Sequence, residues 1–219
     1  MTLATPFARA SSADAADRLG DYYVLPGDGT GSAALVELGG LRLKGGLFND
    51  FDSGVRLFSD FTLPASGRLR YRLTREILPP TVTSNGVWLN VGIVWGNDPA
   101  ALPATTYNGD TYTSTLWDGW RITHANKDLK EIASNRLRIR SYKPREQLPT
   151  REPKVLANFK PGVAYDVTLT WGGRIVTIVA MGKKQSWSNT QLRVPASGAR
   201  LMWYGSFGGQ WLIENIRLD

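Results

Sequence analysis

The sequence predicts an all-β fold: a two-sheet antiparallel jelly-roll β-sandwich over residues 21–219. Three observations predict it. Short segments with alternating apolar residues recur along the chain, Gly, Pro, Asn or Asp separates most of them, and helical periodicity is nearly absent. A series of short strands joined by hairpin turns is typical of sandwiches and jelly rolls. The chain shows no internal repeat, which argues against a propeller or a solenoid.

The first residues differ from the rest in composition. Residues 1–20 are rich in Ala, Ser and Asp, and we expect an arm or a short helix that begins near Ser11 or Ser12. Residues 22–25 begin the strand-rich body, and the run PGDGTGS at 26–32 is a turn. One domain of this length buries a full core without disulfides or structural metal ions.

Eleven further strands follow from the alternating pattern. They are expected at 33–38, 41–47, 54–63, 67–75, 86–96, 111–124, 135–142, 163–171, 174–181, 199–207 and 210–218. Two long connections, 97–110 and 143–158, contain several prolines. Loops of this length in a compact domain are often functional.

The clearest hairpin lies at 162–182, where Gly172 and Gly173 predict a two-residue turn. The register that follows pairs Trp171 with Arg174, Leu169 with Val176, Val167 with Ile178, and Tyr165 with Ala180. This set is apolar except at the turn, so we expect it to face the core.

Charge and composition limit the partners. The chain has 26 basic and 19 acidic residues, a net charge of +7, and no cysteine. The excess of cations favours an anionic partner, whereas the absence of thiols excludes disulfides and thiolate metal sites. No apolar run is long enough to span a membrane, and the N-terminus does not read as a secretory signal. No recognition helix or RNA-binding motif is present, so nucleic acid is disfavoured.

Three segments resemble the concanavalin A-like lectin/glucanase superfamily. The strand Tyr165, Val167, Leu169, Trp171, the closing strand Ile213, Asn215, Ile216, Arg217, and the segment 57–73 are similar to structural motifs of that superfamily. The resemblance implies a curved jelly roll whose concave face holds carbohydrate. The superfamily includes lectins, binding modules, glycosidases, polysaccharide lyases and domains on virus particles. Its glucanases use an E-x-D-x-x-E strand that this chain lacks, which argues against a hydrolase.

Arginine spacing indicates an anion-binding surface. Arg68, Arg70 and Arg72 alternate with apolar residues on one strand, and Arg136, Arg138 and Arg140 do so on another. If these strands are neighbours, Arg70, Arg72, Arg138 and Arg140 line one face and bind carboxylate or sulfate groups. The alternative is a solvated face whose arginines are paired with Asp or Glu on adjoining strands.

Aromatic residues add candidates for sugar stacking. Trp95 and Trp171 lie on expected core faces, whereas Trp88, Trp120 and Trp187 are candidates for the binding surface. Lys184 and Gln185 precede Trp187 and are expected beside it at a polar rim. The alternative for each tryptophan is cover by a loop.

A lyase is the catalytic alternative. His124 is the single histidine, and with Tyr142 as acid it would be the base of a β-elimination on a uronic-acid polymer. The other interpretation is a sheet histidine without a catalytic role. Asp50 and Asp52 are weak candidate ligands for a structural Ca²⁺, and no other cofactor is expected.

The sequence thus favours a non-catalytic domain that binds an anionic polysaccharide. A place outside the cytoplasm or on the surface of a phage-like particle is the expected setting. A polysaccharide lyase and a structural domain that docks on an acidic protein assembly remain the alternatives.

Overall fold

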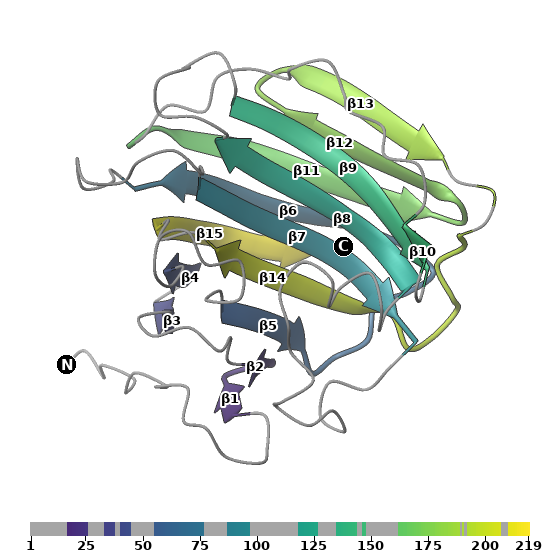
Figure 1. Cartoon of the computed structure of the whole chain (residues 1–219), viewed down its shortest axis with the longest axis horizontal. Helices are drawn as coiled ribbons and strands as arrows, with labels where there is room; N and C mark the ends of the chain where they lie inside the picture. Colours follow the sequence, from purple (N-terminus) through teal and green to yellow (C-terminus); the bar gives the residue numbers. More distant parts are fainter. Residues whose placement is uncertain are drawn as a thin grey trace.

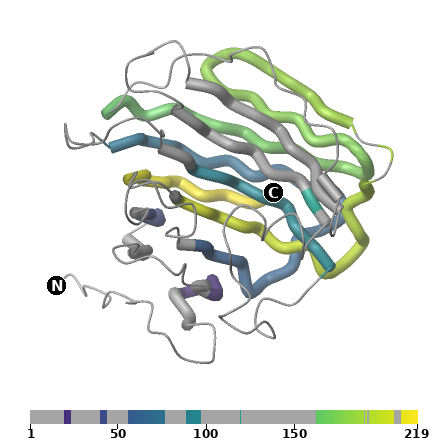
Figure 2. Tube along the Cα trace, viewed as in Figure 1, coloured from purple at the N-terminus to yellow at the C-terminus, as the bar shows by residue number. Residues whose placement is uncertain are grey.

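The computed structural model describes residues 17–25, 33–37, 40–44, 55–76, 87–96, 118–126, 135–143, 146–147, 162–188, 190, 192–206 and 210–219 (Figure 2). These residues form two antiparallel sheets stacked face to face (Figure 1). The described part of the chain contains strands and turns but no helix. The predicted fold class, an antiparallel two-sheet sandwich, is therefore confirmed. Nor does this part hold a helix that could cross a membrane.

One sheet has eight strands. In spatial order these are β1 (Asp17–Leu19), β2 (Tyr22–Leu25), β5 (Val55–Ser59), β14 (Arg200–Ser206), β7 (Val87–Trp95), β8 (Asp118–Asn126), β9 (Asn135–Lys143) and β10 (Glu146–Gln147). The other sheet has seven strands. Their order is β13 (Lys183–Ser188), β12 (Ile175–Ala180), β11 (Ala164–Gly172), β6 (Ser66–Arg75), β15 (Gln210–Leu218), β4 (Gly40–Lys44) and β3 (Ala33–Glu37).

Each of the eleven predicted strands overlaps an observed one, with ends that differ by a few residues at most positions. Three strands were missed: β1, β10 and β13. β1 falls in the segment expected to be an arm or helix, and β10 falls in the predicted loop 143–158. The start of the expected helix and the whole of loop 97–110 lie outside the described residues. β13 was missed because its sequence, KKQSWS, has one apolar residue and gives no alternating apolar pattern.

The core lies between the sheets and is filled by alternate residues of the central strands. Leu69, Tyr71 and Leu73 of β6 are buried there, and so are Leu201 and Trp203 of β14. Tyr71 and Trp203 meet edge to face with ring centroids 5.2 Å apart, so the two sheets touch through aromatic rings.

The two tryptophans assigned to the core pack as expected. Trp171 is 4% exposed, and its indole Nε1 donates a hydrogen bond to the carbonyl oxygen of Pro64 at 2.9 Å. Trp95 is partly buried against the core. Gly67 of β6 lies opposite Trp171, and a Cβ atom there would come within 2.5 Å of the indole ring. The ring therefore occupies the space that a side chain at position 67 would need.

The predicted faces of the β11–β12 hairpin are right, but the predicted register is wrong. Trp171 pairs with Val176 instead of Arg174, and Gly172 pairs with Ile175, so the turn is formed by Gly173 and Arg174. Gly173 has a φ of 57°, which a type II′ turn requires at its first central position. The observed register keeps Arg174 exposed in the turn instead of opposite Trp171. Because the shift is two residues, the same side chains face the core in both registers.

Candidate functional site

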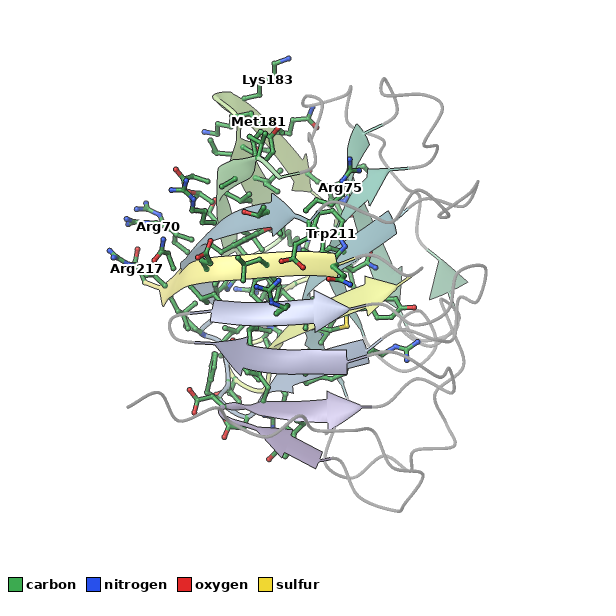
Figure 3. The ribbon with its side chains drawn as sticks, turned by 90° about the vertical axis from the view of Figure 1, so that its left-hand side faces the viewer. Arg70, Arg75, Met181, Lys183, Trp211 and Arg217 are labelled. Carbon is green, nitrogen blue, oxygen red and sulfur yellow. The ribbon has the colours of Figure 1, made fainter. Side chains whose placement is uncertain are left out.

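The outer face of the seven-stranded sheet carries a strip of arginines from β6. Arg68, Arg70 and Arg72 are exposed, whereas the residues between them are buried in the core. The alternation predicted for this strand is therefore confirmed. Figure 3 shows Arg70 projecting away from the sandwich on the side opposite the eight-stranded sheet.

A β-bulge adds a fourth arginine to this face. Glu214 of β15 lies opposite Arg72, but Arg217 lies opposite Arg70, so β15 uses one residue more than β6 between these two pairs. Without the extra residue, Arg217 would lie opposite Leu69 on the core face. Asn215 takes up the extra length with a φ of 54°, in the left-handed region that Asn tolerates better than most residues. The bulge therefore turns Arg217 outward, beside Arg70 (Figure 3).

An aspartate lies among these arginines. The backbone N–H groups of Arg68 and Asp219 donate to each other's carbonyl oxygens at 2.9 and 2.8 Å, which fixes Asp219 opposite Arg68. The Asp219 carboxylate Oδ2 then lies 2.6 Å from Nη2 of Arg70. Both side chains are about half exposed, so water screens this ion pair and its contribution to stability is below about 1 kcal/mol. We call the three arginines Arg68, Arg70 and Arg217, together with Asp219, the Asp219 cluster.

A fifth cation lies across the sheet. Lys184 of β13 is exposed and is linked by register through Val179 and Thr168 to Arg70, which in turn lies opposite Arg217. This row crosses five strands, or about 19 Å at the usual strand spacing. We call the exposed cations on the outer face of this sheet the basic face; its members are Arg68, Arg70, Arg72, Lys184 and Arg217. Lys183 is also exposed, but it pairs with the buried Ala180 and is not a member.

Three carboxylates share the face. Asp166 and Glu214 lie on either side of Arg72 in the register, and Asp219 contacts Arg70. The expected alternative, arginines matched by acidic neighbours, therefore describes Arg72 and Arg70 in part. Five cations against three carboxylates still leave an excess of positive charge among the described residues of this face.

Of the three residues predicted at the polar rim, Lys184, Gln185 and Trp187, only Lys184 faces outward. Trp187 is 9% exposed and belongs to the core, and Gln185 pairs with the buried Ile178 and is half-buried. The prediction of an exposed stacking tryptophan at position 187 is therefore wrong. The reason is that segment 183–188 is a strand, so that Trp187 alternates inward beside Val176.

The two predicted arginine strands do not join into one surface. Arg70 and Arg72 belong to β6 of the seven-stranded sheet, whereas Arg138 and Arg140 belong to β9 of the eight-stranded sheet. The expected convergence of these four residues is therefore wrong. Alternation within a strand is a local property and does not reveal which sheet the strand joins.

The predicted catalytic pair occupies positions of opposite parity in the eight-stranded sheet. His124 pairs with Leu89, a core residue, and with Leu137 on β9. Tyr142 lies five residues beyond Leu137 on the same strand and pairs with Gly119. Because strand residues alternate between faces, an odd spacing does not bring the two positions to one face. The side chains of 120–126 and 135–143 lie outside the description, and so does that of Trp88. The roles of His124, Tyr142, Trp88, Trp120, Arg138 and Arg140 therefore stay predictions.

A buried polar row on the outer face of the eight-stranded sheet was not predicted from the sequence. Arg56, Tyr204 and Asn90 are register neighbours on β5, β14 and β7, and all three are buried. The guanidinium of Arg56 lies over the Tyr204 ring, 4.5 Å from its centroid, in a cation–π contact. Single polar residues inside apolar strands were the signal for this row. Among the described side chains, the charges of this row are buried, whereas those of the basic face are exposed.

On β6, burial shifts the pKa of two ionisable groups, and both lie inside the sandwich. Desolvation raises the pKa of the Tyr71 hydroxyl and lowers the pKa of the Arg75 guanidinium. Arg75 lies at the end of β6 opposite Trp211 (Figure 3). Neither group is at the basic face, so these shifts bear on stability.

The predicted calcium ligands are not placed by the structure, since Asp50 and Asp52 lie outside the described residues. Within the described ranges, no group of three or more His, Cys, Asp or Glu side chains could hold a metal ion. The carbohydrate recognition domain of Emp46p, a structural relative, has been solved in both potassium-bound and metal-free forms.

Comparison with known proteins identifies the fold. No family model matches the chain, and no curated protein sequence matches it significantly. The potassium-bound Emp46p domain is similar in structure, with a TM-score of 0.60 and 10% identity over 91% of this chain and 88% of that one. A protein of unknown function with a galectin-like fold from Bacillus subtilis gives a TM-score of 0.62 and 10% identity, over 91% and 89%.

Basic winged bean lectin, solved with Tn-antigen, has a TM-score of 0.57 and 10% identity over 91% of this chain and 92% of the lectin. Similarity at such low identity concerns the fold. Each of these structures spans nearly the same length as this chain, so the likeness extends over the whole sandwich. The chain therefore has the concanavalin A-like jelly-roll fold that its strand motifs predict.

Proposed function

We propose that this protein is a non-catalytic carbohydrate-binding domain whose ligand is an anionic glycan, a uronate-containing or sulfated polymer. Structures with the same fold include a carbohydrate recognition domain and a lectin, which supports a carbohydrate ligand. The basic face is the observation that carries the anionic specificity. Its arginines are exposed and offer the planar guanidinium groups that hold carboxylate or sulfate oxygens in pairs.

The size of the basic face favours a polymer over a small anion. Lys184 and Arg217 stand at the two ends of a row about 19 Å long, and Arg70 lies between them. A single carboxylate or sulfate group reaches one part of this row. A chain of charged sugars placed across the strands contacts all of it, and the hydroxyl group of Thr168 in the row suits sugar hydroxyls.

The test is calorimetric titration with heparin and alginate as anionic probes and dextran as the neutral one. The variant Arg70→Gln/Arg72→Gln removes two charges from the basic face. Its matched control, Arg174→Gln/Arg193→Gln, removes two exposed charges from the β11–β12 turn and the segment before β14. We expect the first variant to lose about tenfold or more in affinity for one anionic probe and the control to change little. The affinity should also fall as salt rises.

Three results would contradict the proposal. Equal losses in the two double variants would show that only net charge matters. Binding of dextran as tight as that of the anionic probes would remove the anionic specificity. Release of unsaturated sugar, followed by ultraviolet absorbance during the same titration, would replace binding with lyase activity.

The proposed ligand suggests a setting. Uronate-containing and sulfated polymers coat cell surfaces, so we place the protein outside the cytoplasm or on the exterior of a phage-like particle. If the basic face bound neither anionic probe but retained an acidic protein of such a particle, the protein would be a docking domain instead.

A further inference from the structure

We infer that the three arginines of the Asp219 cluster form an oxyanion subsite for one sulfate or carboxylate group, and that the Asp219 carboxylate occupies it in the free protein through its contact with Arg70. The inference rests on the proposed function for the identity of the polymer, but the subsite itself is argued from local geometry. It adds Asp219 to the residues that determine binding and gives Arg217 a specific role beside Arg70.

Two arginines of the cluster lie directly opposite each other. Arg70 and Arg217 are register partners on neighbouring antiparallel strands, an arrangement that is unfavourable for like charges unless an anion lies between them. The bulge at Asn215 is what creates it, since a regular ladder would place Arg217 on the core face. A left-handed residue that turns a cation toward other cations is costly for stability alone. Bulges that redirect a side chain in this way are common next to functional sites.

Asp219 lies beside these two arginines in a fixed position. Two backbone hydrogen bonds to Arg68 hold it in the sheet, and its carboxylate lies 2.6 Å from Nη2 of Arg70. The carboxylate contacts Arg70, while Arg68 lies opposite Asp219 and Arg217 lies opposite Arg70 in the register. Three arginine side chains and one aspartate side chain therefore share this part of the sheet, which leaves two positive charges in excess. The carboxylate has the geometry of the group that the arginines bind in a uronate. A ligand oxyanion must displace it, so Asp219 lowers the affinity of the subsite.

The test uses inorganic sulfate as the probe, with thermal unfolding followed at millimolar sulfate and constant ionic strength. Asp219→Asn keeps the shape and backbone bonds of residue 219 but frees the subsite. We expect its apparent sulfate affinity to rise about two- to fivefold over the native protein, the range for an exposed ion pair. Adding Arg217→Gln to Asp219→Asn should abolish the gain. Asp21→Asn, which removes an exposed charge in the β1–β2 turn, is the control and should show none.

The outcomes separate the subsite from the proposed function. Equal sulfate affinity in the native protein and Asp219→Asn would overturn the subsite, and so would a gain that persists without Arg217 or appears in Asp21→Asn. If Asp219→Asn gains sulfate affinity through Arg217 while no variant binds heparin or alginate, the subsite stands and the polymeric ligand is wrong. If heparin binding is strong but does not change when Arg217 or Asp219 is substituted, the polymeric ligand stands and the subsite is wrong.

Discussion

Single residues in this protein are constrained by what lies directly opposite them. Gly67 faces Trp171 across the β6–β11 pair, and only a hydrogen side chain leaves room for the indole ring. The ring is held in place by its hydrogen bond to Pro64. Close packing of this kind is intolerant of added volume, because a buried ring has nowhere to move.

Gly67→Ala is therefore expected to lower the free energy of unfolding by about 2 kcal/mol, the usual cost of overpacking. Gly172→Ala, one register position away, is the matched control. A Cβ atom there would meet Ser66 at an ordinary 3.5 Å. Urea unfolding curves of the two variants measure the difference, and similar midpoints would show that the ring moves aside.

Tyr71 links stability to alkaline pH. Burial raises the pKa of its hydroxyl above the ordinary value of 10.0, so the unfolded chain releases this proton at lower pH than the folded protein does. The stabilisation by Tyr71 is complete below pH 10 and declines as the pH rises beyond it. The contribution to the slope is at most about 1.4 kcal/mol per pH unit.

In Tyr71→Phe we expect the free energy of unfolding to fall less steeply above pH 10 than in the native protein, whatever the cost of the substitution at pH 7. Urea titrations between pH 8 and pH 11 measure both slopes. Parallel slopes would mean that Tyr71 ionises as easily in the folded protein as in the unfolded chain.

At the scale of elements, the bulge in β15 determines whether Arg217 belongs to the basic face. Residues before Asn215 alternate in one phase and residues after it in the other, so Arg217 reaches the outer face and Ile216 packs against the core. A backbone feature of one residue therefore assigns a cation to the surface. Asn215 lies in the closing-strand motif that resembles those of concanavalin A-like domains.

Asn215→Val should lower the free energy of unfolding by about 1–2 kcal/mol, because a β-branched residue is strained at positive φ. It should also weaken binding of the anionic probe by withdrawing Arg217. Asn215→Gly, which permits the same φ, should retain both stability and binding. Unfolding curves and titrations of the two variants make the comparison, and equal behaviour would show that the bulge does not depend on residue 215.

Most strands and their buried faces could be predicted, because apolar and polar residues alternate along each of these strands. The β6 arginines and the core face of the β11–β12 hairpin were assigned correctly on this basis. The hairpin partners were not, since Gly172 and Gly173 both suit a turn and a two-residue slip preserves the faces. Trp187 was misplaced because a polar strand resembles a loop, and Arg217 was missed because a bulge interrupts the alternation.

At the scale of the whole molecule, the two sheets differ in how they meet the solvent. The outer face of the eight-stranded sheet has a buried row of Arg56, Asn90 and Tyr204, whereas the outer face of the seven-stranded sheet exposes its charges. The assignment of β6 and β9 to different sheets depends on contacts between distant segments, which local patterns do not encode. The exposed charge on the seven-stranded sheet is the reason why we propose an anionic ligand.

The central claim is that an anionic glycan binds across the exposed strands of the seven-stranded sheet. Amide chemical-shift mapping with a sulfated heparin oligosaccharide tests it most directly. We predict that the shifts concentrate on β6, β11 and β15 and extend toward Lys184 on β13. Shifts confined to β7, β8 and β9 would contradict the account and assign binding to the opposite sheet.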